Sequence, residues 1–285
     1  MSLLYVDSGC DLSRDQIKKL GVECVDLPYA INDNTQYFSD EFDYDKFYSK
    51  VRKGVVLNYK PLSKQEYIDI FEPAIKSDDV IYIHSSGNLI DYDILHKAKV
   101  ALLKKYPDRR MELIDSANIS VGQGVFSYLL ARMYRNGATI DEIVSASDKL
   151  KNEVALYMIV DSLDELSNHG LIDKNMITGT ALNIKPIISI DIDGKVQVVD
   201  KASGRKRAVN KLIDIVRQRG ENIVDYPIAI CHSHCKDESE MIEIKLKEYL
   251  GEDIQIFSER LSPSNTALFG INAIGVAFHV HSKIQ

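Results

Sequence analysis

The sequence predicts an α/β protein of two domains with mostly parallel sheets, and a ligand cleft between the domains. Strand-like and helix-like segments alternate along the chain, as is typical of parallel sheets covered by helices. The length of 285 residues is enough for about two domains. In the second half, the turn signal at 191–194 separates two apolar runs and predicts a β-hairpin over 185–199.

In the first half, a strand at 3–6 is followed by a helix at 14–20, whose first turn Ser13 caps. A strand at 22–27 and a polar, aromatic stretch at 31–45 come next. The remaining expected elements are helices near 43–53 and 63–76, a strand at 80–84, a helix at 92–104, a strand at 111–114, helices at 121–136 and 139–154, and a strand at 155–160. We place the domain boundary near residue 160, which gives domains 1–160 and 161–285.

The second half begins with short helical stretches over 162–180, and the hairpin strands follow at 185–190 and 195–199. A second α/β unit completes the chain. Its expected elements are a helix at 204–219, a strand at 226–231, a helix at 237–250, a strand at 254–257, a helix at 264–272 and a strand at 276–280.

Charge and composition exclude several classes of protein. The net charge is −7 and the longest basic run is Arg205-Lys206-Arg207, so we expect no nucleic-acid partner. No stretch approaches the roughly 20 apolar residues of a membrane span, and the N-terminus does not resemble a signal peptide. Four cysteines in a chain of this length do not form a disulfide framework. We therefore expect a cytoplasmic protein without a membrane span.

Three predicted strands of the first half end in small hydroxyl residues. Ser8 follows the first strand, Ser85-Ser86-Gly87 follows the strand at 80–84, and Ser116 follows the strand at 111–114. Ligands of open parallel sheets bind outside the carboxyl ends of the strands. Each serine alone is more simply explained as a helix cap, but the three together favour a shared site for an anion such as a carboxylate.

Several common site signatures are absent. The chain has no dinucleotide or P-loop glycine pattern, no Gly-x-Ser-x-Gly and no His-Glu-x-x-His, so we predict no cofactor. The string at 231–235, Cys-His-Ser-His-Cys, has zinc-binding residue types but no partner cluster, so we predict no metal. The basic run at 205–207 opens a helix, which indicates a solvated helix start or a contact with an anionic ligand or acidic partner.

Read together, these segments resemble the DegV family of bacterial fatty-acid-binding proteins over essentially the whole chain. The resemblance rests on the order and spacing of VDSGCDL, HSSGNL, IDSANISVGQG, LNIKPIISIDIDGKV, GRKRA and GINAIGVAF. It implies two α/β domains with an acyl chain between them. Family members of known role present the acyl carboxylate to a separate fatty acid kinase, which implies a carrier without catalytic residues of its own.

The resemblance also implies which residues bind the ligand. Ser86 and Asn58 would hydrogen-bond the head group, Ser85 and Gly87 would shape the loop, and Ser8 and Ser116 would line the same end. The chain departs from the family pattern at positions that bear on the head group and on kinase recognition. Two of these departures are the segments Leu57 to Pro61 and Asn88 to Asp91. In addition, Leu171 and Ser203 stand where the family has arginines, and Leu268 stands where it has a histidine.

Two other functions stay open at this point. The first is a hydrolase or transferase with Ser86 as nucleophile. Its base would be a histidine from the second domain, because a strand running on through Ser86 would hold His84 in place. The candidates are His169, His232 and His234. The second is a regulatory interaction protein that has lost its ligand.

Overall fold

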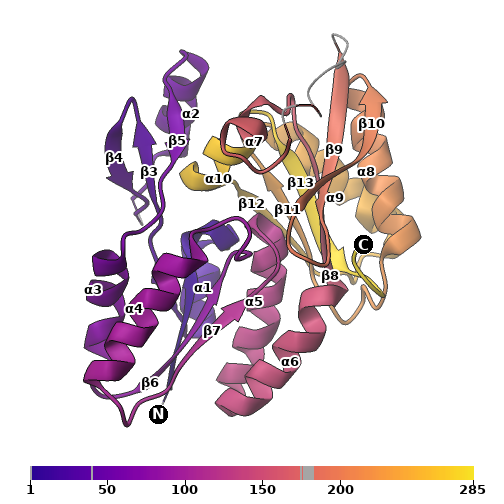
Figure 1. Cartoon of the computed structure of the whole chain (residues 1–285). Coiled ribbons are helices and arrows are strands. Elements are labelled where there is room, and N and C mark those ends of the chain that lie inside the picture. The colour runs from indigo at the N-terminus through magenta and orange to yellow at the C-terminus, as the bar shows by residue number, and fades with distance from the viewer. Residues whose placement is uncertain (1, 40, 174, 176–182) are drawn as a thin grey trace.

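The computed structural model describes residues 2–39, 41–173, 175 and 183–285. Within these ranges the strands form three sheets, with the orders β2-β1-β6-β7, β10-β9-β8-β13-β11-β12 and β4-β3-β5. Figure 1 shows the four-stranded and six-stranded sheets side by side, with helices α5 and α6 at their junction. The α/β fold class predicted from the sequence is confirmed.

The four-stranded sheet is parallel throughout, as predicted. Its strands and covering helices alternate because each apolar strand returns through an amphipathic helix. The elements are β1 Ser2–Asp7, α1 Arg14–Leu20, β2 Glu23–Val25, α3 Lys64–Ile75, β6 Asp79–His84, α4 Tyr92–Lys105 and β7 Met111–Asp115. Helices α3 and α4 bury Phe71, Ile75, Leu95 and Leu102 against one face of this sheet.

The six-stranded sheet is mixed, and here the expectation of mostly parallel strands is wrong. Only β11 and β12 pair in parallel, whereas the other four neighbouring pairs are antiparallel. One cause is the predicted hairpin, which joins β9 and β10 through the turn at 191–194 and can only be antiparallel. The strands are β8 Val154–Ile159, β9 Ile184–Ile190, β10 Val196–Ser203, β11 Ile228–His232, β12 Ile256–Arg260 and β13 Ile274–His279.

Strand β8 belongs to the six-stranded sheet, where it pairs with β9 and β13. Two helices, α5 Ser120–Arg135 and α6 Ile140–Glu153, connect it to β7 of the first sheet. The chain therefore changes sheet between α6 and β8, several residues before the boundary that we placed near 160. Helix α5 packs on one face of the six-stranded sheet. Helices α8 Arg205–Arg219 and α9 Lys236–Leu250 cover the other face.

A small three-stranded sheet stands apart from the first sheet (Figure 1). It consists of β3 Pro28–Ile31, β4 Asn34–Tyr37 and β5 Leu57–Tyr59, with α2 Tyr44–Arg52 beside it. The predicted polar stretch at 31–45 thus contains strand β4. The sequence alone did not reveal that this strand pairs with β3. Tyr48 donates a hydrogen bond to the carbonyl oxygen of Leu261 at 3.1 Å, and α10 Pro263–Phe269 contacts β5, so this sheet also packs against the second half.

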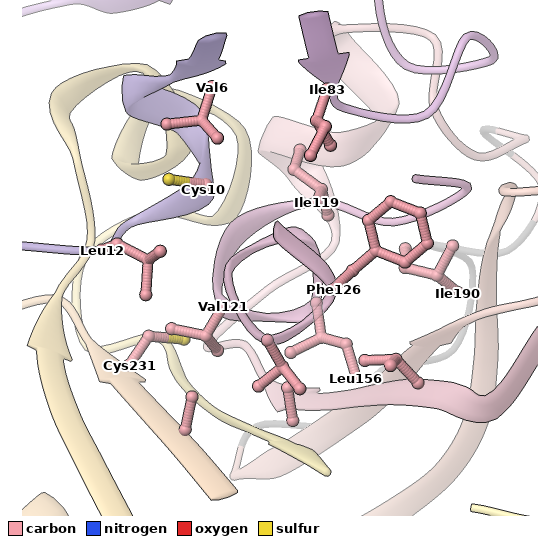
Figure 2. Close-up of a cluster of buried hydrophobic side chains, with 14 of the residues drawn as sticks. Val6, Cys10, Leu12, Ile83, Ile119, Val121, Phe126, Leu156, Ile190 and Cys231 are labelled. Carbon is pink, nitrogen blue, oxygen red and sulfur yellow. The ribbon is translucent and has the colours of Figure 1, made fainter. Parts of the chain in front are cut away.

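The largest hydrophobic core lies around α5 and joins the two halves of the molecule. The first half carries the four-stranded sheet, and the second half begins at β8 and carries the six-stranded sheet. Figure 2 shows Val6, Cys10 and Ile83 from the first half facing Leu156, Ile190 and Cys231 from the second, with Phe126 between them. The predicted helical stretch at 162–180 contains α7 Asp164–Asn168, and its positions 174 and 176–180 lie outside the described residues. In the described part of the chain, no helix has the length and apolar character needed to cross a membrane.

Candidate functional site

The predicted serines gather at the carboxyl edge of the parallel sheet. Because β1, β6 and β7 are neighbours and run in the same direction, the loops after them emerge side by side. The Ser86 backbone N–H donates to the carbonyl oxygen of Asn118 at 2.7 Å, which joins the loop after β6 to the loop after β7. This edge faces the hairpin of the six-stranded sheet.

A buried polar network lies directly under these loops. The Asp7 carboxylate is 2% exposed and accepts hydrogen bonds from the Gly9 N–H at 2.9 Å and the Tyr82 hydroxyl at 3.1 Å. Ser85 donates its hydroxyl proton to Gln123 Oε1 at 2.7 Å. Burial raises the pKa of Asp7 to about 6, although hydrogen bonds led by those of Gln123 and Tyr82 oppose the shift. Ser85 therefore supports the loop from below.

Ser86 faces the second half of the molecule. Its hydroxyl is fully buried and donates to the carbonyl oxygen of Gly194, in the hairpin turn, at 2.8 Å. Asn88 Nδ2 donates to the carbonyl oxygen of Asp193 at 2.6 Å. Because a hydroxyl has a single proton, Ser86 cannot donate to a ligand while it is bonded to Gly194.

The other predicted residues of this edge also have internal partners. The Gly87 N–H donates to Asp115 Oδ2 at 3.0 Å, and the Ser116 hydroxyl donates to the carbonyl oxygen of Asn118 at 3.2 Å. Ser8 Oγ accepts a hydrogen bond from the backbone N–H of Leu27 at 2.9 Å. In this structure these three residues hold loops in place.

Asn58 lies on a different sheet from the serines. It is a half-buried residue of β5, paired with Ala30 of β3, and its side chain has no hydrogen bond within the described residues. The neighbouring Tyr59 was missed by the sequence analysis. Tyr59 packs against the core that joins the two halves, burial raises the pKa of its hydroxyl, and the negative charges of Asp7 and Asp91 raise that pKa further.

A cavity of about 330 Å³ opens between the two halves beside Ser8. Of the residues predicted to bind the ligand, Ser8 lines this cavity, whereas Asn58, Ser85, Ser86, Gly87 and Ser116 do not. Its walls carry both aromatic rings and charged groups. The guanidinium group of Arg14 lies over the ring of Phe38, and that of Arg260 lies over the ring of Tyr44. The remaining lining residues are Asp11, Leu12, Ser13, Ser39, Phe42, Ser258, Glu259 and Ser262.

Asp11, also missed by the sequence analysis, joins the two halves next to this cavity. Its carboxylate accepts hydrogen bonds from the Ser262 N–H at 2.7 Å, the Asn265 amide at 2.7 Å and the Ser120 hydroxyl at 2.6 Å. Burial raises the pKa of Asp11 to about 6, against the effect of these hydrogen bonds.

Four cysteines are unpaired thiols: Cys10, Cys24, Cys231 and Cys235.

The histidines do not form a catalytic pair with Ser86. His84 Nδ1 lies 2.6 Å from the carbonyl oxygen of Ser85, and its ring packs between Tyr82 and Tyr92. His232 and His234 line a separate pocket of about 360 Å³ at the start of α9. Across the described ranges, no group of three or more His, Cys, Asp or Glu side chains is arranged to hold a metal ion.

The basic helix start and the substituted positions are used internally. Arg205 forms a two-pronged ion pair with Glu238, at 2.7 Å for the closest atoms, and approaches Asp161 at 3.9 Å. Leu268 is buried, and Leu171 packs against the core that joins the two halves. Arg205 therefore serves a structural ion pair in this conformation.

Comparison of the whole fold with solved structures finds close similarity. The structure of a stearic acid-binding protein from Eubacterium ventriosum has a TM-score of 0.86 at 22% identity, covering 98% of each chain. A DegV family protein from Ruminococcus gnavus, solved with vaccenic acid, has a TM-score of 0.84 at 23% identity, covering 97% of this chain and 99% of that chain. The Fak B3 protein of the Streptococcus pneumoniae fatty acid kinase, loaded with linoleic acid, has a TM-score of 0.84 at 18% identity, covering 98% and 99%.

Sequence comparison leads to the same group of proteins. A DegV domain-containing protein of Clostridium perfringens is 31% identical over 261 residues, 89% of this chain and 89% of that protein. Another, from Caldanaerobacter subterraneus, is 29% identical over 250 residues, 87% of this chain and 88% of that protein. The model of the DegV family, which is described as uncharacterised, matches residues 3–281. Because this match spans nearly the whole sequence, the chain belongs to the DegV family.

Proposed function

We propose that this protein binds a long-chain fatty acid, or a similar lipid, between its two halves, with the carboxyl group beside the Ser85-Ser86-Gly87 loop. The main support is the fold, which matches over almost its full length that of a stearic acid-binding protein and of proteins solved with vaccenic and linoleic acids. The position of the loop supports it further, because the loop lies at the carboxyl edge of a parallel sheet and faces the second half.

Burial of the acyl chain would provide most of the affinity. About 16 methylene groups at roughly 0.8 kcal/mol each contribute about 13 kcal/mol before the costs of association are subtracted. The polar end then sets the orientation of the ligand. Ser86 and Asn58 are the proposed donors to the head group, and Ser8, Ser85, Gly87 and Ser116 are the proposed supports around it.

Binding at Ser86 requires an exchange of partners. The Ser86 proton is donated to Gly194 in the present structure, so a carboxylate must displace that carbonyl oxygen. Asn58 needs no such exchange, because its amide has no partner in the described residues. Head-group binding is therefore coupled to the contact between the loop and the hairpin.

We propose a carrier that performs no chemistry on the acyl chain and acts in the cytoplasm. No imidazole among the described residues contacts the Ser86 hydroxyl, so the geometry does not favour the alternative of a serine hydrolase or transferase. The four free thiols are consistent with a reducing compartment. Presentation of the carboxylate to a separate fatty acid kinase is the finer part of the proposal, motivated by similarity to Fak B3.

Denaturing extraction and mass spectrometry of the purified protein test this proposal directly. We expect a co-purifying fatty acid in the wild type and a lower yield from Ser86→Ala. Ser145→Ala, on the exposed face of α6, is the matched control and should keep the wild-type yield. After delipidation, a fatty acid at 100 times its Kd should stabilise the fold by about 2.7 kcal/mol. Protein that carries no lipid and gains no stability from any fatty acid would point to the ligand-free regulatory alternative instead.

A further inference from the structure

Lys283, the third residue from the C-terminus, is buried without a charged partner. Its side chain is 3% exposed, and its ammonium donates to the carbonyl oxygen of Ala117. No carboxylate of the described residues lies within ion-pair distance of it. Lysine is almost never buried to this degree unless it is paired, because desolvating an ammonium is costly. An unpaired buried cation of this kind requires an explanation.

The C-terminal segment holds this side chain in place. The Lys283 N–H donates to the carbonyl oxygen of Asn152 at 2.8 Å, and the carbonyl oxygen of Ile284 accepts from the Ile192 N–H at 3.0 Å. The segment is thus fixed between the end of α6 and the hairpin turn. The ammonium reaches from there into the loop that follows β7.

Ala117, whose carbonyl oxygen accepts from the ammonium, lies against the same glycine as Ser86. Gly194 has a φ of +76°, and a Cβ placed there would be 2.1 Å from Ser86 Oγ and 3.3 Å from Ala117 Cα. Ser86, Gly194 and Ala117 therefore meet at one point. Two buried donors, the Ser86 hydroxyl and the Lys283 ammonium, are bonded to the carbonyl oxygens of Gly194 and Ala117.

The charged groups that face Lys283 are already occupied. Asp115 accepts from the N–H groups of Gly87 at 3.0 Å and Ala117 at 2.7 Å. Asp191 accepts from backbone N–H groups within its own turn. Burial lowers the pKa of Lys283 to about 7, although the charges of Asp115 and Asp191 oppose the shift. An incoming anion would therefore be the first close partner for this charge.

We propose that Lys283 is the charge partner of the ligand carboxylate and so determines the preference for an acid over a neutral lipid. This inference rests on the function proposed above. One carboxylate oxygen accepts the Ser86 proton in place of the Gly194 carbonyl, and the other accepts from the Lys283 ammonium in place of the Ala117 carbonyl. The two exchanged acceptors belong to Gly194 and Ala117, which lie against each other, so a movement of the hairpin turn would free both donors.

Calorimetric binding of laurate and of 1-dodecanol to the delipidated full-length protein tests the inference. At pH 8.5, in two buffers of different ionisation enthalpy, we expect the wild type to take up about one proton per laurate, because a bound carboxylate restores the charge of Lys283. Binding of 1-dodecanol should take up none. Lys283→Met should weaken laurate binding about 10- to 100-fold, as expected for loss of a charged hydrogen bond. It should change dodecanol binding by less than about 2-fold.

Lys195→Met is the matched control, because Lys195 lies exposed at the same hairpin turn, and it should leave both affinities and the proton uptake unchanged. Equal weakening of both ligands by Lys283→Met, or equal affinity of the wild type for laurate and 1-dodecanol, would overturn the inference and leave the proposed function standing. If the wild type binds neither ligand nor a longer fatty acid, the proposed function itself fails. The comparison of the two ligands on the wild type needs no variant, so it decides the matter even if Lys283→Met does not fold.

Discussion

The carboxylate of Asp11 links the stability of the interface between the halves to pH. It lies in a fully buried position and accepts hydrogen bonds from Ser120 on α5 and from Ser262 and Asn265 in the second half. Its pKa rises from 3.8 to about 6 on folding, because burial penalises the charged form more than the hydrogen bonds favour it.

The sign and size of the effect follow from the two pKa values. Between pH 3.8 and about 6, the folded protein binds the Asp11 proton more tightly than the unfolded chain does. The stabilising contribution of this proton is complete below pH 3.8 and is lost as the pH rises through about 6. A shift from 3.8 to about 6 corresponds to about 3 kcal/mol of unfolding free energy.

Urea unfolding of the wild type and of Asp11→Asn, measured from pH 4 to pH 7, isolates this contribution. The amide that replaces the carboxyl group cannot satisfy every donor, so at pH 4, where Asp11 of the folded wild type is protonated, the variant should be less stable by about 1–3 kcal/mol. The wild type then loses the contribution of the Asp11 proton as the pH rises, so the unfolding free energy of the wild type minus that of the variant should fall by about 2.5 kcal/mol between pH 4 and pH 7. Asp7, whose pKa is also raised to about 6, is present in both proteins and cancels.

Asp15→Asn serves as the control, because Asp15 lies on the exposed face of α1. Its difference from the wild type should stay constant with pH to within about 0.5 kcal/mol. A difference for Asp11→Asn that is equally constant, or that grows as the pH rises, would refute the assignment of a raised pKa to Asp11.

Three further changes test the packing. In chemical denaturation, Gly194→Ala should lower the unfolding free energy by about 2–4 kcal/mol, because the new Cβ would meet Ser86 Oγ at 2.1 Å. Gly137→Ala is the control: Gly137 also has a positive φ, but nothing lies within 4 Å of the new Cβ, so the loss should be about 1 kcal/mol. Phe126→Ala, in the core between the sheets, should lower the unfolding free energy by about 3–5 kcal/mol, and a loss below 1 kcal/mol would show that the two halves do not share this core. Tyr48→Phe removes one hydrogen bond to the second half and should cost about 0.5–1.5 kcal/mol by the same measurement.

Elements that depend on local sequence were predictable. The parallel sheet follows from apolar strands alternating with capped helices, and Ser13 and Ser63 indeed begin α1 and α3 with capping boxes. The hairpin follows from its turn residues, since Gly194 adopts the left-handed conformation that the turn requires.

The strand directions of the six-stranded sheet were not predictable in the same way. A buried apolar strand such as β13 has the same residue pattern whether its neighbours run parallel or antiparallel to it. Its direction is set when it inserts between β8 and β11, two strands that lie far from each other in the sequence. Only long-range contacts carry that information.

In the candidate site too, features that depend on local sequence were predictable and long-range contacts were not. The serines could be found because each follows a strand, but their partners could not. Gln123 lies inside a helix and Gly194 in a distant turn, and nothing in either local pattern refers to Ser85 or Ser86. Lys283 is separated from Ala117 by 166 positions and looks like an ordinary polar residue of a chain end.

The packing also restricts where an acyl chain can lie. Around Phe126 the two halves are in direct contact through buried side chains, and a Cβ added at Gly124 of α5 would lie 2.5 Å from the Cys10 carbonyl oxygen. That region has no room for a guest, whereas the cavity beside Ser8 of about 330 Å³ borders the segment between β4 and α2. We therefore expect fatty acid binding to change hydrogen exchange in the three-stranded sheet and the hairpin turn, while α5 keeps its protection. Ligand-induced changes confined to α5 would contradict this placement, because they would require the shared core to open.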